Sequence, residues 1–124
     1  MHFISTQSAP QAIGPYSQAI ISNGFLFSSG QIALDPMTMQ IVEGGIEAQT
    51  KRVLANLEAV LKEAKTSKEK VVKTTLFLKN MNDFAIVNKI YEEFFASHKP
   101  ARSTVEVARL PKDVLIEIEC VAEV

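Results

Sequence analysis

Two oppositely charged side chains in the last quarter of the chain are of types that can bind an anion and transfer protons. Arg102 lies in the segment RSTVEV and Glu117 lies in LIEIE. A planar guanidinium can hold a carboxylate through two parallel hydrogen bonds, worth ~1.5–3 kcal/mol for a charged contact. A carboxylate can act as a general acid or base, which accelerates proton transfer ~10²–10⁴-fold. The alternative interpretation is an exposed ion pair of little energetic value, and the pattern alone favours it.

The other reactive side chains form no catalytic or metal-binding pattern. His2 and His98 lie far apart, with no cysteine or carboxylate at a metal-ligand spacing, so we expect no metal site. Cys120 falls on a predicted core face and is expected to be a buried apolar residue. Ser28 and Ser29 have no base in their sequence context, which argues against a Ser-His-Asp hydrolase.

The last two predicted strands, about 102–107 and 115–121, determine where Arg102 and Glu117 lie. Along the second strand, apolar side chains at 116, 118 and 120 alternate with Glu117 and Glu119. Successive side chains of a strand point to opposite faces. We therefore expect the apolar set to face the core and both glutamates to face the other way.

The strand before it alternates in the same manner. If its valines face the core, Arg102 and Thr104 project from the opposite face. An antiparallel register that respects these faces pairs Thr104 with Glu117 and Arg102 with Glu119. Arg102 and Glu117 are then diagonal neighbours, ~7–8 Å apart at the backbone. We expect the four side chains to share one face of a final hairpin.

Strand-like and helix-like periods alternate along the rest of the chain. The dipeptide Asn23-Gly24 favours a two-residue turn between two strands because both positions tolerate positive φ. The helices show apolar side chains at a spacing of three to four residues. The predicted elements are strands 17–22, 25–32 and 71–78, a helix over 46–65, and a second helix capped by Asn82 or Asp83 that ends near Ser97. Phe3–Ser5 fits a short additional strand.

The order β-β-α-β-α-β-β predicts an α+β domain over residues 1–124, with one mixed sheet and both helices on a single face. A chain of 124 residues, 47% of them apolar, can form one core. Several strands carry apolar residues of both parities, as Phe25 and Phe27 do against Leu26. The helix-free face is therefore also apolar, and self-association is the simplest way to cover it.

Charge and composition argue against several classes of partner and location. Thirteen basic and fourteen acidic side chains give a net charge of −1, with no strongly basic half, which argues against a nucleic-acid partner. The single cysteine fits a reducing compartment. The N-terminal segment lacks the pattern of a signal peptide, and no apolar run is long enough to span a membrane. We expect a cytoplasmic protein.

Four segments, in this order along nearly the whole chain, resemble the RidA/YjgF family: AIGPYSQAI, SSGQI, KTTLFLKNMNDFAIVN and PARSTVEVARLPKDVLIEIE. The resemblance implies a chorismate-mutase-like fold and a homotrimer with clefts between subunits. It also implies hydrolysis of reactive 2-imino acids and their enamine tautomers, such as 2-iminobutanoate and 2-iminopropanoate, to 2-oxo acids and ammonia. These imines are by-products of pyridoxal-phosphate dehydratases, and the family enzyme uses neither metal nor organic cofactor.

The same resemblance implies roles for individual residues. Arg102 is expected to bind the substrate carboxylate, and Glu117 to act as acid and base or to position water. Further positions match residues that line the family's cleft: Tyr16, Ser29, Gly30, Asn88 and Thr104. The chain departs from the pattern at Thr104, where many members carry cysteine. It also has a shortened segment FFASHKPARS, with Lys99 where an aromatic residue is common.

Two other functions remain open at this point. The chain could be a regulator that binds 2-oxo acids or other small carboxylates without turnover, although Arg102 and Glu117 together favour the enzyme. A ribonuclease or translation inhibitor, an activity reported for some relatives, is disfavoured by the absence of a basic surface or of a histidine acid–base pair.

Overall fold

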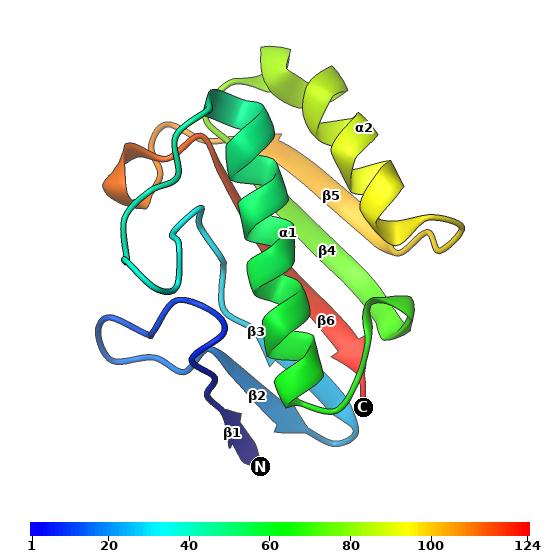
Figure 1. The fold of residues 1–124 in the computed structure, drawn as a ribbon. Helices are drawn as coiled ribbons and strands as arrows, with labels where there is room; N and C mark the ends of the chain where they lie inside the picture. Colours follow the sequence, from blue (N-terminus) through cyan, green and yellow to red (C-terminus); the bar gives the residue numbers. More distant parts are fainter.

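The computed structural model describes residues 1–124 and shows a sheet covered on one face by two helices (Figure 1). The predicted α+β arrangement is confirmed, including the short additional strand at the N-terminus. The strands are β1 (His2–Ile4), β2 (Ala19–Ser22), β3 (Phe25–Ser28), β4 (Val71–Leu78), β5 (Ala101–Glu106) and β6 (Ile116–Glu123). The helices are α1 (Gly45–Glu63) and α2 (Phe84–Phe95).

The strand order is β1-β2-β3-β6-β4-β5, and it corrects the prediction of a final hairpin. β4 lies between β5 and β6, antiparallel to β6 and parallel to β5. The physical reason is the connection through α2. A strand that follows a helical crossover returns parallel to the strand before the helix. β5 therefore pairs with β4 and leaves β6 on the other side.

This order also corrects the predicted face of Arg102 and Thr104. In the parallel register, Arg102 lies beside Thr74 and Thr104 beside Leu76. Thr74 and Leu76 are 1% and 0% exposed beneath the helices, so Arg102 and Thr104 lie on the helix-covered side. Val105, which was expected in the core, is 41% exposed on the helix-free face.

The turns and loops follow local backbone requirements. Asn23 and Gly24 adopt φ of 51° and 80°, as the turn between β2 and β3 requires. β3 ends at Ser28, earlier than predicted, and the chain then leaves the sheet except for a bridge to β6. Asp83 occupies the N-cap position of α2, one of the two predicted, but its side chain makes no capping hydrogen bond. Asn80 caps the 3-10 turn before α2, and its Oδ1 accepts a hydrogen bond from the backbone N–H of Asn82.

The core lies between the helices and the sheet. α1 contributes Val53, Leu54, Leu57, Val60 and Leu61, each at most 3% exposed. Cys120 lies on the sheet side of this core, as predicted, and burial raises the pKa of its thiol to about 11. Neither helix is long and apolar enough to cross a membrane.

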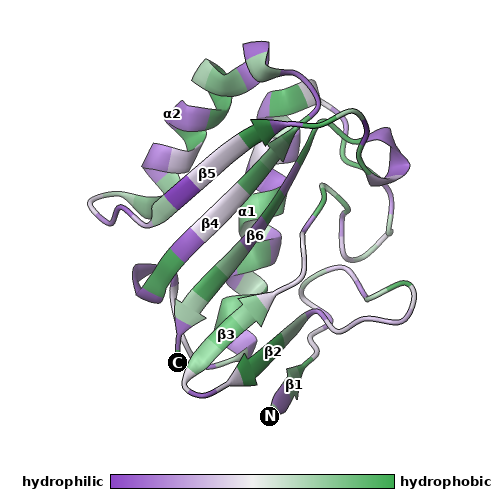
Figure 2. Cartoon of the chain, turned by 180° about the vertical axis from the view of Figure 1, so that it is seen from behind, coloured by the Kyte–Doolittle hydropathy of each residue, from purple (hydrophilic) through white to green (hydrophobic).

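The helix-free face of the sheet is open and partly apolar. Figure 2 views the molecule from this side, with the helices behind the strands. Phe3, Phe25 and Phe27 are 65%, 40% and 49% exposed. Phe27 pairs with Val121 of β6, and this row of apolar side chains continues to Phe3 on β1. The second apolar face expected from the sequence is therefore present.

Candidate active site

Four of the seven predicted site residues line one cavity of about 520 Å³. Tyr16 comes from the loop that precedes β2, and Ser29 and Gly30 follow the end of β3. Glu117 is the second residue of β6 and projects from the helix-free side, as predicted. Three separate segments thus converge on this cavity. Apolar side chains complete much of its wall: Ile13, Ile32, Leu34 and Pro111.

The Glu117 carboxylate is half-buried and has no hydrogen-bond or ion-pair partner in the chain. Burial raises the pKa of its carboxyl group, and the nearby charge of Glu119 raises it further. Gly30 lies directly against this carboxylate. A Cβ added at Gly30 would be 2.5 Å from Oε2 of Glu117. Gly30 is therefore required for space and not for an unusual φ.

Hydrogen bonds fix the segments on either side of this pair. Ser29 donates from its hydroxyl to the carbonyl of Ser17 at 2.5 Å and from its N–H to the carbonyl of Gln18 at 2.9 Å. The Tyr16 hydroxyl accepts from the N–H of Ile13 at 3.3 Å, so its ring folds back over its own loop. The hydroxyl and the N–H of Ser29 are thus both occupied by hydrogen bonds to the backbone, whereas Tyr16 remains 51% exposed beside the cavity.

The remaining predicted residues, Asn88, Arg102 and Thr104, form a second group at α2 and β5. Arg102 Nη1 donates to Asn88 Oδ1 at 2.7 Å. Its guanidinium carbon lies 4.9 Å from the ring centroid of Tyr91 and 5.3 Å from that of Phe84. These contacts hold the guanidinium plane while its other N–H groups have no partner in the chain.

Thr104 borders the same surface depression as Arg102. Its hydroxyl oxygen is buried and has no hydrogen-bond partner. A buried hydroxyl without a partner is unusual, because its desolvation is then uncompensated. Arg102 and Thr104 together offer unused polar groups at the edge of the sheet.

The two groups do not meet within one chain, which corrects the expectation that Arg102 and Glu117 are neighbours. β4 separates their strands, and Arg102 is level with Cys120, three residues along β6 from Glu117. Two strand spacings and this offset place their backbones roughly 14 Å apart. Their side chains also project from opposite faces of the sheet. One chain therefore presents a carboxylate-bearing cavity and, separately, an arginine-bearing edge.

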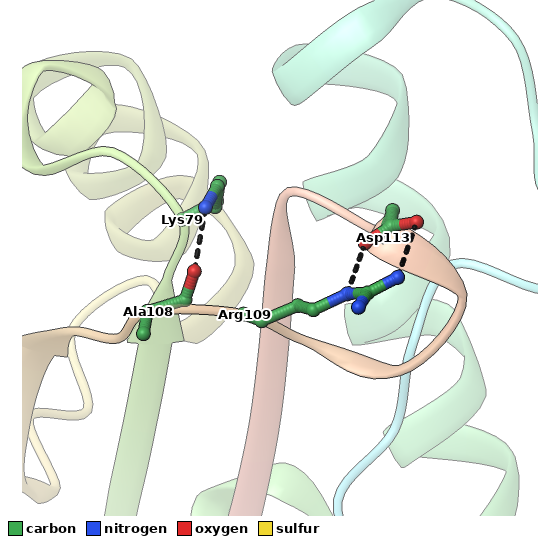
Figure 3. Close-up of polar contacts among 4 residues, drawn as sticks. All are labelled: Lys79, Ala108, Arg109 and Asp113. Atoms are coloured by element: carbon green, nitrogen blue, oxygen red, sulfur yellow. Dashed lines mark hydrogen bonds and ion pairs between the residues drawn. The ribbon is translucent and has the colours of Figure 1, made fainter.

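The turn before β6 forms part of the cavity and was treated only as a loop in the sequence. Arg109 holds it through two hydrogen bonds to Asp113, at 2.7 and 3.3 Å, and Lys79 donates to the carbonyl of Ala108 at 2.6 Å (Figure 3). Lys112 lines the cavity and adopts a φ of 55°. The pairing of Arg109 with Asp113 at i,i+4 was the available signal for an ordered turn.

The histidines lie outside both groups. His98 Nε2 lies 2.6 Å from the carbonyl oxygen of Val71, and His2 lies on β1. No three His, Cys, Asp or Glu side chains converge in a way that could hold a metal ion.

Comparison with known proteins identifies the family. Residues 6–124 match the family model described as endoribonuclease L-PSP. A structure from Yersinia pestis, described as the Rid family protein YyfA of unknown function, superposes with a TM-score of 0.97 at 54% identity and covers 99% of this chain and 98% of that one. The chain belongs to the RidA/YjgF family.

Some relatives within the RidA/YjgF family are named only by family, whereas others are named by a reaction. The RutC family protein slr0709 of Synechocystis is 64% identical over 124 residues, covering 98% of this chain and 95% of that protein. The human 2-iminobutanoate/2-iminopropanoate deaminase is 49% identical over 119 residues, covering 96% and 87%. Similarity to the RidA/YjgF family therefore extends along almost the whole chain.

Proposed function

We propose that this protein is a deaminase that hydrolyses reactive 2-imino acids to 2-oxo acids and ammonia, without a metal or organic cofactor. The observation that carries the proposal is the half-buried, unpaired Glu117 carboxylate in a cavity, with its pKa raised by burial. A carboxyl group whose pKa is raised holds a proton more readily than an ordinary one, which suits it both to accept and to return a proton. The deaminase name of a relative 49% identical supports the same chemistry.

The site is completed by a second copy of the chain, in a homotrimer in which the β5 edge of one subunit lies against the helix-free face of the next. Arg102 and Glu117 lie on opposite faces of one chain, so a single copy cannot place both on one small substrate. A head-to-tail contact, which closes into a ring in a trimer, brings different surfaces of the chain together. In the proposed site, one subunit supplies Glu117 and Gly30, and its neighbour supplies Arg102.

The substrate carboxylate binds the free N–H groups of Arg102, which Asn88 and two aromatic rings hold in place. Water adds to C2 of the protonated imine as Glu117 takes one of its protons. Glu117 then returns that proton to the amine nitrogen of the carbinolamine. The C2–N bond breaks, and the hydroxyl proton leaves with ammonia as ammonium. Holding the imine and the water together in one site also lowers the barrier to their reaction, because their loss of translational freedom is then part of binding.

A coupled assay tests the activity. A threonine dehydratase generates 2-iminobutanoate in situ, and the release of 2-oxobutanoate is followed with and without this protein. Arg102→Ala and Glu117→Gln should each abolish the acceleration. If wild-type protein binds 2-oxobutanoate in an Arg102-dependent way but does not accelerate release, the regulator interpretation is correct and the deaminase proposal is wrong.

Mixing the two inactive variants tests the shared site. Random subunit exchange at equal concentrations places an intact Glu117 opposite an intact Arg102 at about a quarter of the interfaces. Turnover should therefore return to about that fraction of the wild-type rate. A site contained in one chain would give no recovery, and that result would contradict the intersubunit arrangement.

A further inference from the structure

A buried amide side chain borders the cavity and anchors one of its walls. Gln18, immediately before β2, is 3% exposed. Its carbonyl oxygen accepts from the N–H of Thr6 at 2.7 Å, and its nitrogen donates to the carbonyl of Thr6 at 3.0 Å and of Pro10 at 2.7 Å. A longer contact of 3.4 Å reaches the carbonyl of Ala9. Both ends of the amide are therefore satisfied by one stretch of loop.

That stretch forms one wall of the cavity. Residues 6–16 contain no helix or strand, and four of them line the cavity: Pro10, Gln11, Ile13 and Tyr16. The other hydrogen bonds of residues 6–13 stay within the loop, such as Ser8 N–H to Thr6 Oγ1 and Ile13 N–H to the Tyr16 hydroxyl. No charged residue occurs between His2 and Asp35, so no ion pair from residues 6–16 can hold this loop in place. Gln18 is its one hydrogen-bonded link to the rest of the protein.

We propose that Gln18 is a positioning residue that fixes the cavity wall bearing Tyr16 against Glu117, an inference that rests on the proposed deaminase function. Gln18 acts through the loop backbone and not on the substrate. Loss of its amide leaves buried N–H and C=O groups unpaired, and the loop has no other bond that restores its position. A displacement of ~1 Å in a catalytic site can lower the rate ~10²-fold.

Two variants and one control separate positioning from stability. Gln18→Met keeps the length of the side chain and removes every hydrogen bond. Gln18→Glu keeps the acceptor for Thr6 and loses the donors while its carboxyl group is ionised. Leu61→Ala removes a side chain that is 1% exposed in α1, outside the cavity, and lowers the stability through a core cavity alone.

The two tyrosines of the chain provide a local readout. Tyr16 lies in the wall, whereas Tyr91 is buried and its hydroxyl lies 2.7 Å from that of Thr74. Labelling with 3-fluorotyrosine gives two ¹⁹F resonances, which Tyr91→Phe assigns. Gln18→Met should move the Tyr16 resonance towards its unfolded position, leave that of Tyr91 in place, and lower kcat/KM roughly 10- to 100-fold.

Gln18→Glu should recover part of this loss as the pH is lowered, relative to wild type at each pH, because the protonated carboxyl group again donates a hydrogen bond. Leu61→Ala should change neither the Tyr16 resonance nor kcat/KM. The proposal is wrong if Gln18→Met keeps the wild-type resonance and kcat/KM, or if Leu61→Ala, at an equal loss of thermal stability, reproduces both changes.

Failure of the proposed function has a different signature. Wild-type protein would then show no turnover, whereas the Tyr16 resonance and the affinity for 2-oxobutanoate, measured by calorimetry, still report on the wall. In that case Gln18→Met must move the resonance and weaken binding for the positioning role to stand. An unchanged affinity would overturn it.

Discussion

Glu117 and Gly30 act as a pair in which one residue supplies the reactive group and the other supplies space. The carboxylate lies where any side chain at residue 30 would be. Sequence alternation predicted the face of Glu117 correctly, because Ile116 and Ile118 on either side of it are strongly apolar. The close approach of Gly30 had no sequence signal beyond the family resemblance, because residues 30 and 117 are brought together only by the sheet.

Gly30→Ala should lower kcat by about 10²-fold while leaving the fold intact, since the added methyl displaces the Glu117 carboxylate by ~1 Å. The coupled imine assay measures the rate, and circular dichroism checks the fold. Adding Glu117→Asp to Gly30→Ala shortens the acid and should recover part of the loss. A fully active Gly30→Ala protein would show that the carboxylate position is not critical.

The pH dependence of turnover should report the environment of Glu117. Its raised pKa means that the base form is lost at a higher pH than for an ordinary carboxyl group, so the acid limb of kcat/KM is shifted upward. Glu119→Gln removes one of the two causes of this shift. The acid limb should therefore move to lower pH, and a shift to higher pH, or none, would contradict the assignment of Glu117 as the base.

At the scale of elements, the sequence predicted which segments are strands and helices but not how the last strands pair. Val71–Leu78 was predicted with the bounds that the structure shows. The hairpin interpretation of β5 and β6 was wrong because both strands have alternating patterns that fit any neighbour. A signal was present: β4, α2 and β5 follow one another as strand, helix and strand, which favours parallel pairing.

The prediction for β5 was also wrong about which face of the sheet its side chains occupy. Its valines were assigned to the core, but Val105 is exposed on the helix-free face. When both faces of a sheet are apolar, one for the core and one for a partner, the parity of apolar residues does not identify the core side. Arg102 was consequently placed on the wrong face, and with it the contact with Glu117.

The turn between β2 and β3 should depend on backbone conformation alone. Gly24 has a φ of 80°, and a Cβ there would meet no atom within 4 Å. Gly24→Ala should therefore destabilise the protein by ~1 kcal/mol without any steric clash. Urea unfolding at a fixed protein concentration measures the change. The variant should retain wild-type turnover, which makes it a glycine-to-alanine control for Gly30→Ala.

At the scale of the whole molecule, the exposed apolar face predicts assembly. Phe27 is 49% exposed at the middle of this face. Phe27→Glu should dissociate the protein to its chain mass of 13.7 kDa in sedimentation equilibrium and abolish turnover, because the neighbour's Arg102 is lost with the contact.

Met37→Glu is the matched control for this experiment. Met37 is 90% exposed in a loop between β3 and α1, so the same change of an apolar residue to an acid should preserve both mass and turnover. Wild-type protein should sediment at three times the chain mass. A Phe27→Glu variant that keeps the wild-type mass would show that the helix-free face is not the contact surface.

Because Cys120 is buried, the rate at which its thiol reacts reports how often the core opens. The thiol is 4% exposed on the core side of β6, and with a pKa of about 11 almost none of it is thiolate at neutral pH. Because the thiolate is the reactive form, alkylation requires β6 to separate from α1. The labelling rate of this single cysteine, compared with that of an unfolded chain, therefore measures the free energy of opening the core without any denaturant.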